Sequence, residues 1–134
     1  LNLEYTLPDI SQSLIITRME GKTKVPPKES IESFAAHQAS MAIYLSTGML
    51  KELSRRLIAG GYEAATPAAI VYKATWPEEK IVHCTVGTLA ECGAAAGIRK
   101  TALILVGNFL NPVYERSKLY DPEFTTGFRK GVER

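Results

Sequence analysis

The sequence predicts an α/β domain built on a mixed, five-stranded sheet flanked by helices, and three observations support this. Short apolar runs rich in β-branched residues alternate, though imperfectly, with segments whose apolar residues recur every three or four positions. The link between residues 72 and 80 is too short for a crossover helix, so the strands that it joins must pair antiparallel. At 134 residues and 46% hydrophobic, the chain can bury one core.

The first predicted strand covers residues 13–18, a β-branched run that ends before Gly21 and the Pro26-Pro27 pair. A short amphipathic helix follows over residues 29–37, because Ile31, Phe34 and Ala35 fall on one face. The next strand is predicted at residues 40–45 and is closed by a tight loop.

Residues 49–59 are predicted to form the second helix. Leu50, Leu53, Leu57 and Ile58 recur on one of its faces. The Gly60-Gly61 pair that follows is expected to end the helix, since glycine accepts a positive φ without strain.

The remaining elements follow from turn residues and composition. A third strand at 66–72 begins with Pro67 at a position where no ladder donor is needed. A fourth strand at 80–85 follows the Trp76-Pro77 turn, and an alanine-rich helix at 89–96 stops at Gly97. The fifth strand, at 101–106, is the most apolar.

Composition excludes several classes of function. Sixteen Lys and Arg against fourteen Asp and Glu give a net charge of +2, and the basic residues are scattered, which argues against nucleic acid as the partner. The apolar run at 101–107 is shorter than the roughly 20 residues of a bilayer span. The chain shows no signal peptide, so we expect no membrane partner and a cytoplasmic location, where Cys84 and Cys92 stay as plain reduced thiols.

No side chain is predicted to be catalytic, and no metal site is expected. His37 and His83 each lack a neighbouring Asp or Ser, so both are better interpreted as structural. Glu78 and Glu79 are adjacent in a turn, point apart and are expected to solvate a loop. Phosphate-binding, nucleophile-elbow and zinc-ligand spacings are all missing from the sequence.

Small and hydroxyl-bearing residues gather at predicted strand ends, at 44–48, 73–75 and 100–102. In open α/β sheets ligands bind at such ends, because small side chains let a ligand approach the backbone. The alternative is that these residues simply make turns.

Four segments resemble the C-terminal half of the tetrapyrrole (corrin/porphyrin) methylase family. They are LPDISQS at 7–13 running into IITR at 15–18, AIYL at 42–45, TPAAIV at 66–71 and ALILVG at 102–107. The segments PDISQ at 8–12, ITRMEG at 16–21 and KVP at 24–26 are most similar to the branch that methylates carbon 11 of precorrin-4 or cobalt-precorrin-4 in cobalamin biosynthesis. The resemblance implies that residues 1–110 form the C-terminal domain and 111–134 a tail.

The resemblance also implies a cofactor, S-adenosylmethionine, held in a cleft between two α/β domains opposite the tetrapyrrole. The family's N-terminal Gly-x-Gly-Pro-Gly-Asp-type loop does not occur in these residues, so the N-terminal domain is expected to be absent and the isolated chain to be inactive. Arg18 would bind a substrate carboxylate, or instead form a salt bridge within the domain. The positions implied to contact the cofactor are Leu45, Ala74, Thr75, Thr101 and Ala102. Of these, Thr101 occupies a position that is often Pro in relatives.

Alternative functions stay open at this point. One is a stand-alone, non-catalytic oligomerisation or binding module, and another is a methylase that acts on uroporphyrinogen III or in diphthamide synthesis. The family further implies a homodimer. Aromatic residues of the tail are expected to add apolar area to the contact between protomers, namely Tyr114, Tyr120, Phe124 and Phe128.

Overall fold

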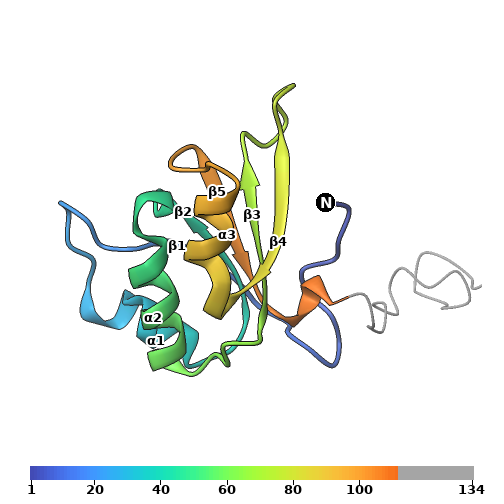
Figure 1. Ribbon diagram of the computed structural model, residues 1–134. Coiled ribbons are helices and arrows are strands. Elements are labelled where there is room, and N and C mark those ends of the chain that lie inside the picture. Colours follow the sequence, from blue (N-terminus) through green and yellow to red (C-terminus); the bar gives the residue numbers. More distant parts are fainter. Residues whose placement is uncertain (112–134) are drawn as a thin grey trace, which may run out of the picture.

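The chain folds into two layers, a mixed five-stranded sheet and a layer of helices that covers one of its faces (Figure 1). The structure, a computed structural model, describes residues 1–111. The predicted fold class is therefore confirmed. The tail aromatics expected at a dimer contact lie outside the described residues.

The strand order across the sheet is β1-β2-β5-β3-β4. The β1 strand pairs parallel with β2, whereas β2–β5, β5–β3 and β3–β4 are antiparallel, which confirms the predicted pairing across residues 72–80. The carboxyl ends of β1, β2 and β3 therefore share one edge of the sheet with the starts of β5 and β4. This edge is called the strand-end edge below. The strands are β1 (Leu14–Arg18), β2 (Ser40–Tyr44), β3 (Pro67–Tyr72), β4 (Lys80–Thr85) and β5 (Ala102–Val106).

Within residues 1–111 the helices are α1 (Ile31–Ala35), α2 (Leu50–Gly60) and α3 (Leu89–Ala95). The α1 helix is shorter than predicted for two local reasons. The Ser30 side chain accepts a hydrogen bond from the Ser33 N–H at 3.1 Å and so fixes the start of the helix. Gln38 has a φ of 49°, and His37 lies beyond the helix end. Gly60 is the last residue of α2, and Gly61, with a φ of 136°, caps it.

The core lies between the sheet and the helices. Alternate residues of the three central strands point toward the helices and meet the apolar faces of α2 and α3. Removing such side chains from water stabilises the fold by about 1.5–3 kcal/mol each. The largest of these fully buried side chains are Met41, Ile43, Leu53, Leu57, Ile70, Leu89, Ile104 and Val106.

An ion pair ties α1 to α2. The Arg56 side chain, only 12% exposed, donates to both carboxylate oxygens of Glu32 at 2.7 Å, and its Nη2 lies 3.4 Å from Glu20 Oε1. A bidentate pair of this kind is stronger than a single contact between exposed charges. The hydrogen bond from Arg56 holds the pKa of the Glu32 carboxyl below its usual range, against the opposing effect of burial.

This pKa predicts a pH dependence of stability. Because the folded-state pKa of Glu32 is depressed, the pair stabilises the fold above the unfolded-state pKa, and this stabilisation is lost as pH falls through the folded-state pKa. In urea unfolding between about pH 7 and pH 3, Glu32→Gln should therefore lose less stability on acidification than the unchanged chain. Glu52→Gln is the matched control, because Glu52 pairs with Arg55 on the exposed face of α2. Equal pH profiles for both variants would contradict the assignment.

Candidate functional site

The strand-end edge brings together the residues that sequence analysis placed at a site. Because β5 lies between β2 and β3, the order along this edge is Arg18, Leu45, Thr101 and Thr75. Neighbouring strands are about 4.8 Å apart, so the line from β1 to β3 spans three spacings, or about 14 Å. Ala74 adjoins Thr75 and Ala102 adjoins Thr101, which puts every predicted contact position on this one line.

The backbone along this edge is unusual. Leu45, Thr75 and Thr101 have φ values of 55°, 71° and 58°, and Lys73 has 45°. Among the non-glycine residues in the described part of the chain, Gln38 alone shares this left-handed conformation elsewhere. Such a conformation costs on the order of 1–3 kcal/mol per residue, and in proteins it clusters at functional sites.

Hydrogen bonds hold the ends of β3 and β5 in place. The Lys73 N–H donates to the Thr101 carbonyl at 3.0 Å, and the Thr47 hydroxyl donates to the Ala102 carbonyl at 3.2 Å. The Thr75 N–H donates to Glu79 Oε2 at 2.5 Å, so Glu79 fixes this turn and does more than solvate a loop.

Ala74 presents free backbone groups in the turn that follows β3, at one end of this line. Within residues 1–111, no hydrogen bond to its N–H or carbonyl is found, and its side chain is exposed. A small residue with free backbone groups lets a ligand come close and bind the main chain.

A hollow of about 370 Å³ lies beside the β1–β2 part of the edge. Arg18 and Leu45 both line it, together with Lys24, Glu29 and Tyr44. Arg18 Nη1 donates to the carbonyls of Met19 at 3.1 Å and Thr23 at 3.2 Å. No carboxylate of residues 1–111 pairs with Arg18, so the internal salt bridge that the sequence left open is not found there.

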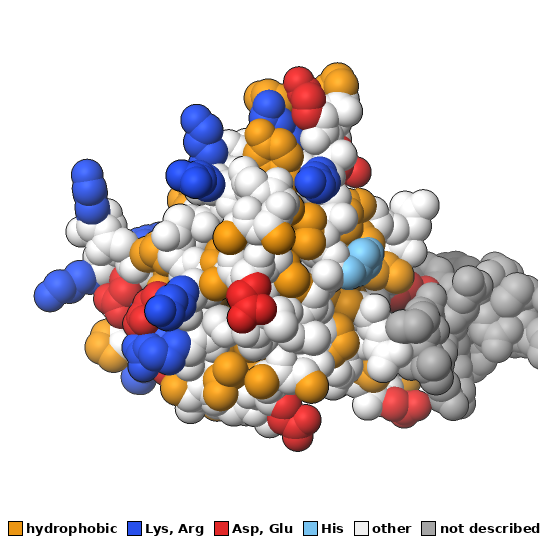
Figure 2. Space-filling view, in the orientation of Figure 1, with side chains coloured by type: hydrophobic (Ala, Val, Ile, Leu, Met, Phe, Trp, Pro, Cys, Tyr) orange, Lys and Arg blue, Asp and Glu red, His pale blue; other side chains and the backbone are white. Residues whose placement is uncertain are grey.

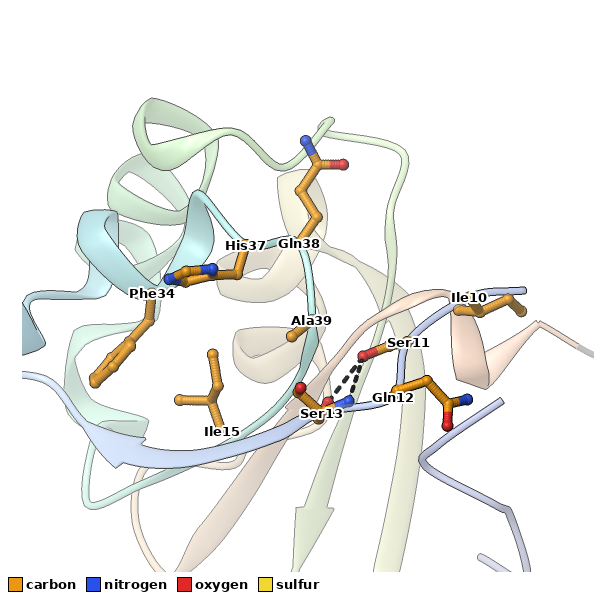
Figure 3. A pocket seen from close by; sticks show the side chains of 9 residues that line it. All are labelled: Ile10, Ser11, Gln12, Ser13, Ile15, Phe34, His37, Gln38 and Ala39. Atoms are coloured by element: carbon orange, nitrogen blue, oxygen red, sulfur yellow. Dashed lines mark hydrogen bonds between the residues drawn. The ribbon is translucent and has the colours of Figure 1, made fainter. Parts of the chain in front are cut away.

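A second hollow, of about 480 Å³, lies at the opposite edge of the sheet (Figure 3). Ser11 organises its rim, because its hydroxyl donates to the Ser13 carbonyl at 2.8 Å and accepts from the N–H groups of Ser13 and Ser40. His37 and Phe34 face this hollow from the end of α1 (Figure 3). None of the predicted contact positions lies here. The His37 N–H donates to the Phe34 carbonyl at 3.1 Å, and among the described residues the imidazole ring has no hydrogen-bond partner.

The two cysteines are free and half-buried. Burial, with Cys92 nearby, raises the pKa of the Cys84 thiol to about 12, so this thiol is neutral at ordinary pH and a poor nucleophile. In the part of the chain that the structure describes, no group of His, Cys, Asp and Glu side chains could hold a metal ion, and no helix is long and apolar enough to cross a membrane.

The sequence located Lys73 at a strand end and Trp76 in a turn, but neither was predicted to belong to a site. The Lys73 ammonium lies over the rings of Tyr72 and Trp76. The sequence signal for this contact is the segment YKATW at 72–76. In this segment, aromatic residues stand one position before the lysine and three positions after it.

Comparisons with known proteins identify the family and the fold. The family model of the tetrapyrrole (corrin/porphyrin) methylases matches residues 1–90. The cobalt-precorrin-4 C(11)-methyltransferase of Methanocaldococcus jannaschii is 50% identical over 135 residues, covering 100% of this chain and 52% of that protein. The chain thus spans about half the length of the curated relatives it matches.

Two solved structures are also similar. A cobalt precorrin-4 methyltransferase superposes with a TM-score of 0.79 at 44% identity, over 82% of this chain and 46% of that one. The uroporphyrin-III C-methyl transferase of Thermus thermophilus, complexed with S-adenosylhomocysteine, gives a TM-score of 0.67 at 18% identity, over 83% of this chain and 48% of that one. The second likeness shows a shared fold.

Proposed function

Because the chain belongs to the tetrapyrrole (corrin/porphyrin) methylase family, we propose that it is part of an enzyme of cobalamin biosynthesis. This enzyme transfers a methyl group from S-adenosylmethionine to carbon 11 of precorrin-4 or cobalt-precorrin-4. The chain contributes the strand-end edge to the cleft that holds the cofactor and the substrate.

The observation that carries the choice of substrate is the 50% identity, over the whole chain, to a cobalt-precorrin-4 C(11)-methyltransferase. The similar solved structures point the same way, since identity is 44% to the precorrin-4 enzyme and 18% to the uroporphyrin-III enzyme. These values favour precorrin-4 over uroporphyrinogen III as the substrate.

The geometry of the strand-end edge supports the assignment of a cofactor wall. Adenosine offers hydrogen-bond donors and acceptors on its base and ribose, and the free backbone groups of Ala74 match them. The proposed wall consists of small or left-handed residues that let the ligand approach the main chain, namely Leu45, Ala74, Thr75, Thr101 and Ala102.

Catalysis on this proposal depends on alignment. When bound, S-adenosylmethionine supplies a methyl group on a positively charged sulfur. The residues of the edge orient the cofactor and exclude water from one side of it. Holding the reactants in line can lower the activation barrier by up to about 7–11 kcal/mol. Arg18, in the hollow that it shares with Leu45, would bind a substrate carboxylate through its remaining guanidinium nitrogens.

The division into a C-terminal domain at 1–110 and a tail at 111–134 belongs to the same proposal. So do the homodimer and the cytoplasmic location, which both stay predictions. A Gly-Pro-Gly-Asp-type motif encoded about 100 residues upstream in the same reading frame, which is roughly one domain's length, would support the enzyme over the non-catalytic module.

The proposal is tested with the protein encoded by the complete reading frame that contains these residues. It is incubated with S-adenosylmethionine labelled with carbon-13 in the methyl group, and with precorrin-4 or cobalt-precorrin-4. We expect one new labelled methyl resonance, assigned to carbon 11, and an equal amount of S-adenosylhomocysteine. Uroporphyrinogen III serves as the competing substrate. Label on uroporphyrinogen III alone would favour the other branch of the family, and no label on any substrate would favour the non-catalytic module.

A further inference from the structure

Lys73 is held at the strand-end edge between two aromatic rings. Its Nζ lies 5.4 Å from the centroid of the Tyr72 ring and 5.3 Å from that of Trp76, within the distance at which cation–π attraction acts. Tyr72 is the last residue of β3 and packs against the core, so it fixes one side of this clamp. Trp76 belongs to the β3–β4 turn and is 56% exposed. The half-buried lysine side chain therefore has a defined position.

Among the described residues, no carboxylate pairs with this ammonium group. Glu78 and Glu79 are close in sequence, but Glu79 accepts the Thr75 N–H and stays with its own turn. An ammonium group has three donors and no acceptor, so Lys73 presents an oriented positive charge to an acceptor outside the described residues.

Basic residues also outnumber acidic residues in the connections at the strand-end edge. Three basic residues lie at or next to strand termini on this edge, namely Arg18, Lys73 and Lys80. Two more, Arg99 and Lys100, come just before β5. The acids of the β3–β4 turn are Glu78 and Glu79. The connections described at the opposite edge, at residues 7–13, 37–39, 61–66 and 107–111, contain no Lys or Arg. Figure 2 shows Lys and Arg side chains along the upper rim of the molecule, where the strand-end edge lies in Figure 1.

We propose that Lys73 binds a carboxylate of the macrocyclic substrate and so helps to select tetrapyrroles that carry many acid side chains. This inference rests on the proposed function, which puts the tetrapyrrole at the strand-end edge. Lys73 and Arg18 belong to strands about 14 Å apart along this edge, so a macrocycle with acid groups on opposite rims can meet both. A clamped lysine also loses less rotamer freedom on binding than a free one.

The test uses the protein of the complete reading frame and two porphyrin probes, uroporphyrin with eight carboxylates and coproporphyrin with four. Dissociation constants come from the anisotropy of porphyrin fluorescence at constant ionic strength. Lys73→Met keeps the aliphatic stem and removes the charge, and we expect it to weaken uroporphyrin binding by about 10- to 100-fold, the range for a hydrogen bond to a charged group. The preference for uroporphyrin over coproporphyrin should shrink as well, which a purely structural role would not cause.

Two further variants make the result specific. Lys73→Arg keeps a cation that stacks on aromatic rings, and its affinity should stay within about threefold of the unchanged protein. Arg55→Met removes the same charge from the exposed face of α2, and its affinity should change by less than about twofold.

Several outcomes would overturn the inference: no porphyrin binding by the unchanged protein, equal affinity in Lys73→Met, or equal losses in Lys73→Met and Arg55→Met. A parallel titration with S-adenosylhomocysteine separates it from the proposed function. Cofactor binding by the unchanged protein, with no effect of Lys73→Met on porphyrin affinity or preference, would overturn the role of Lys73 alone. A protein that binds porphyrin through Lys73 but does not bind S-adenosylhomocysteine would overturn the methyltransferase proposal.

Discussion

Replacing Ala74 by leucine is expected to weaken the binding of S-adenosylhomocysteine on the order of 100-fold. Ala74 is exposed on the strand-end edge in the turn after β3, and its N–H and carbonyl have no partner among residues 1–111. A leucine side chain would fill the space through which the ligand reaches these groups. Overpacking of this kind costs about 1–3 kcal/mol, and about 2.7 kcal/mol corresponds to a factor of 100 in affinity. Isothermal titration calorimetry on the protein of the complete reading frame measures the effect.

Ala59→Leu is the matched control for this experiment. Ala59 is exposed near the end of α2, away from the strand-end edge, so the same enlargement should leave the affinity unchanged. Thermal melting of both variants checks that each is folded. Unchanged affinity in a folded Ala74→Leu variant would remove Ala74 from the cofactor wall.

The strands were predictable from local pattern, but their neighbours in the sheet, apart from the β3–β4 pair, were not. Each predicted strand agrees with the structure to within one residue at either end, because compact β-branched runs bounded by turn residues carry their own signal. The insertion of β5 between β2 and β3 depends on contacts between residues that are far apart in the sequence. Apolar periodicity says which face of a strand is buried and does not say which strand lies beside it.

The position of the candidate site was predictable, but the conformation of its backbone was not. Small and hydroxyl residues at strand ends, together with the family resemblance, pointed to Leu45, Thr75 and Thr101. Their left-handed φ values had no signal in the sequence, because glycine and asparagine are the residues that usually adopt this conformation. The hydrogen-bond partners of Arg18 could not be predicted either, because they depend on how the loop at 19–26 folds back onto the end of β1. The functional roles of all these residues stay predictions.

Gly60→Ala should lower stability by about 2–3 kcal/mol, at the upper end of the usual cost of overpacking. A Cβ atom at Gly60 would lie 2.6 Å from the Ala35 Cβ, 2.7 Å from the Glu32 carbonyl oxygen and 2.8 Å from the Glu32 Cα. None of these atoms ends a flexible side chain, so α1 and α2 would have to move apart. The same movement would strain the Arg56–Glu32 pair that joins these helices.

The sign of this effect distinguishes packing from helix propensity. Replacing glycine by alanine inside a helix normally raises the free energy of unfolding by about 0.5–1 kcal/mol. A net decrease must therefore come from the contact between the helices. Gly48→Ala is the control, because a Cβ there meets nothing within 4 Å and the residue has no positive φ. Urea unfolding at neutral pH should show a lower midpoint for Gly60→Ala. Thermal unfolding should show a melting temperature reduced by on the order of 10 °C. A midpoint equal to or above that of the unchanged chain would contradict this prediction. It would show that α1 can shift away from α2 at little cost in stability, so that the close approach at Gly60 does not limit the packing of these two helices.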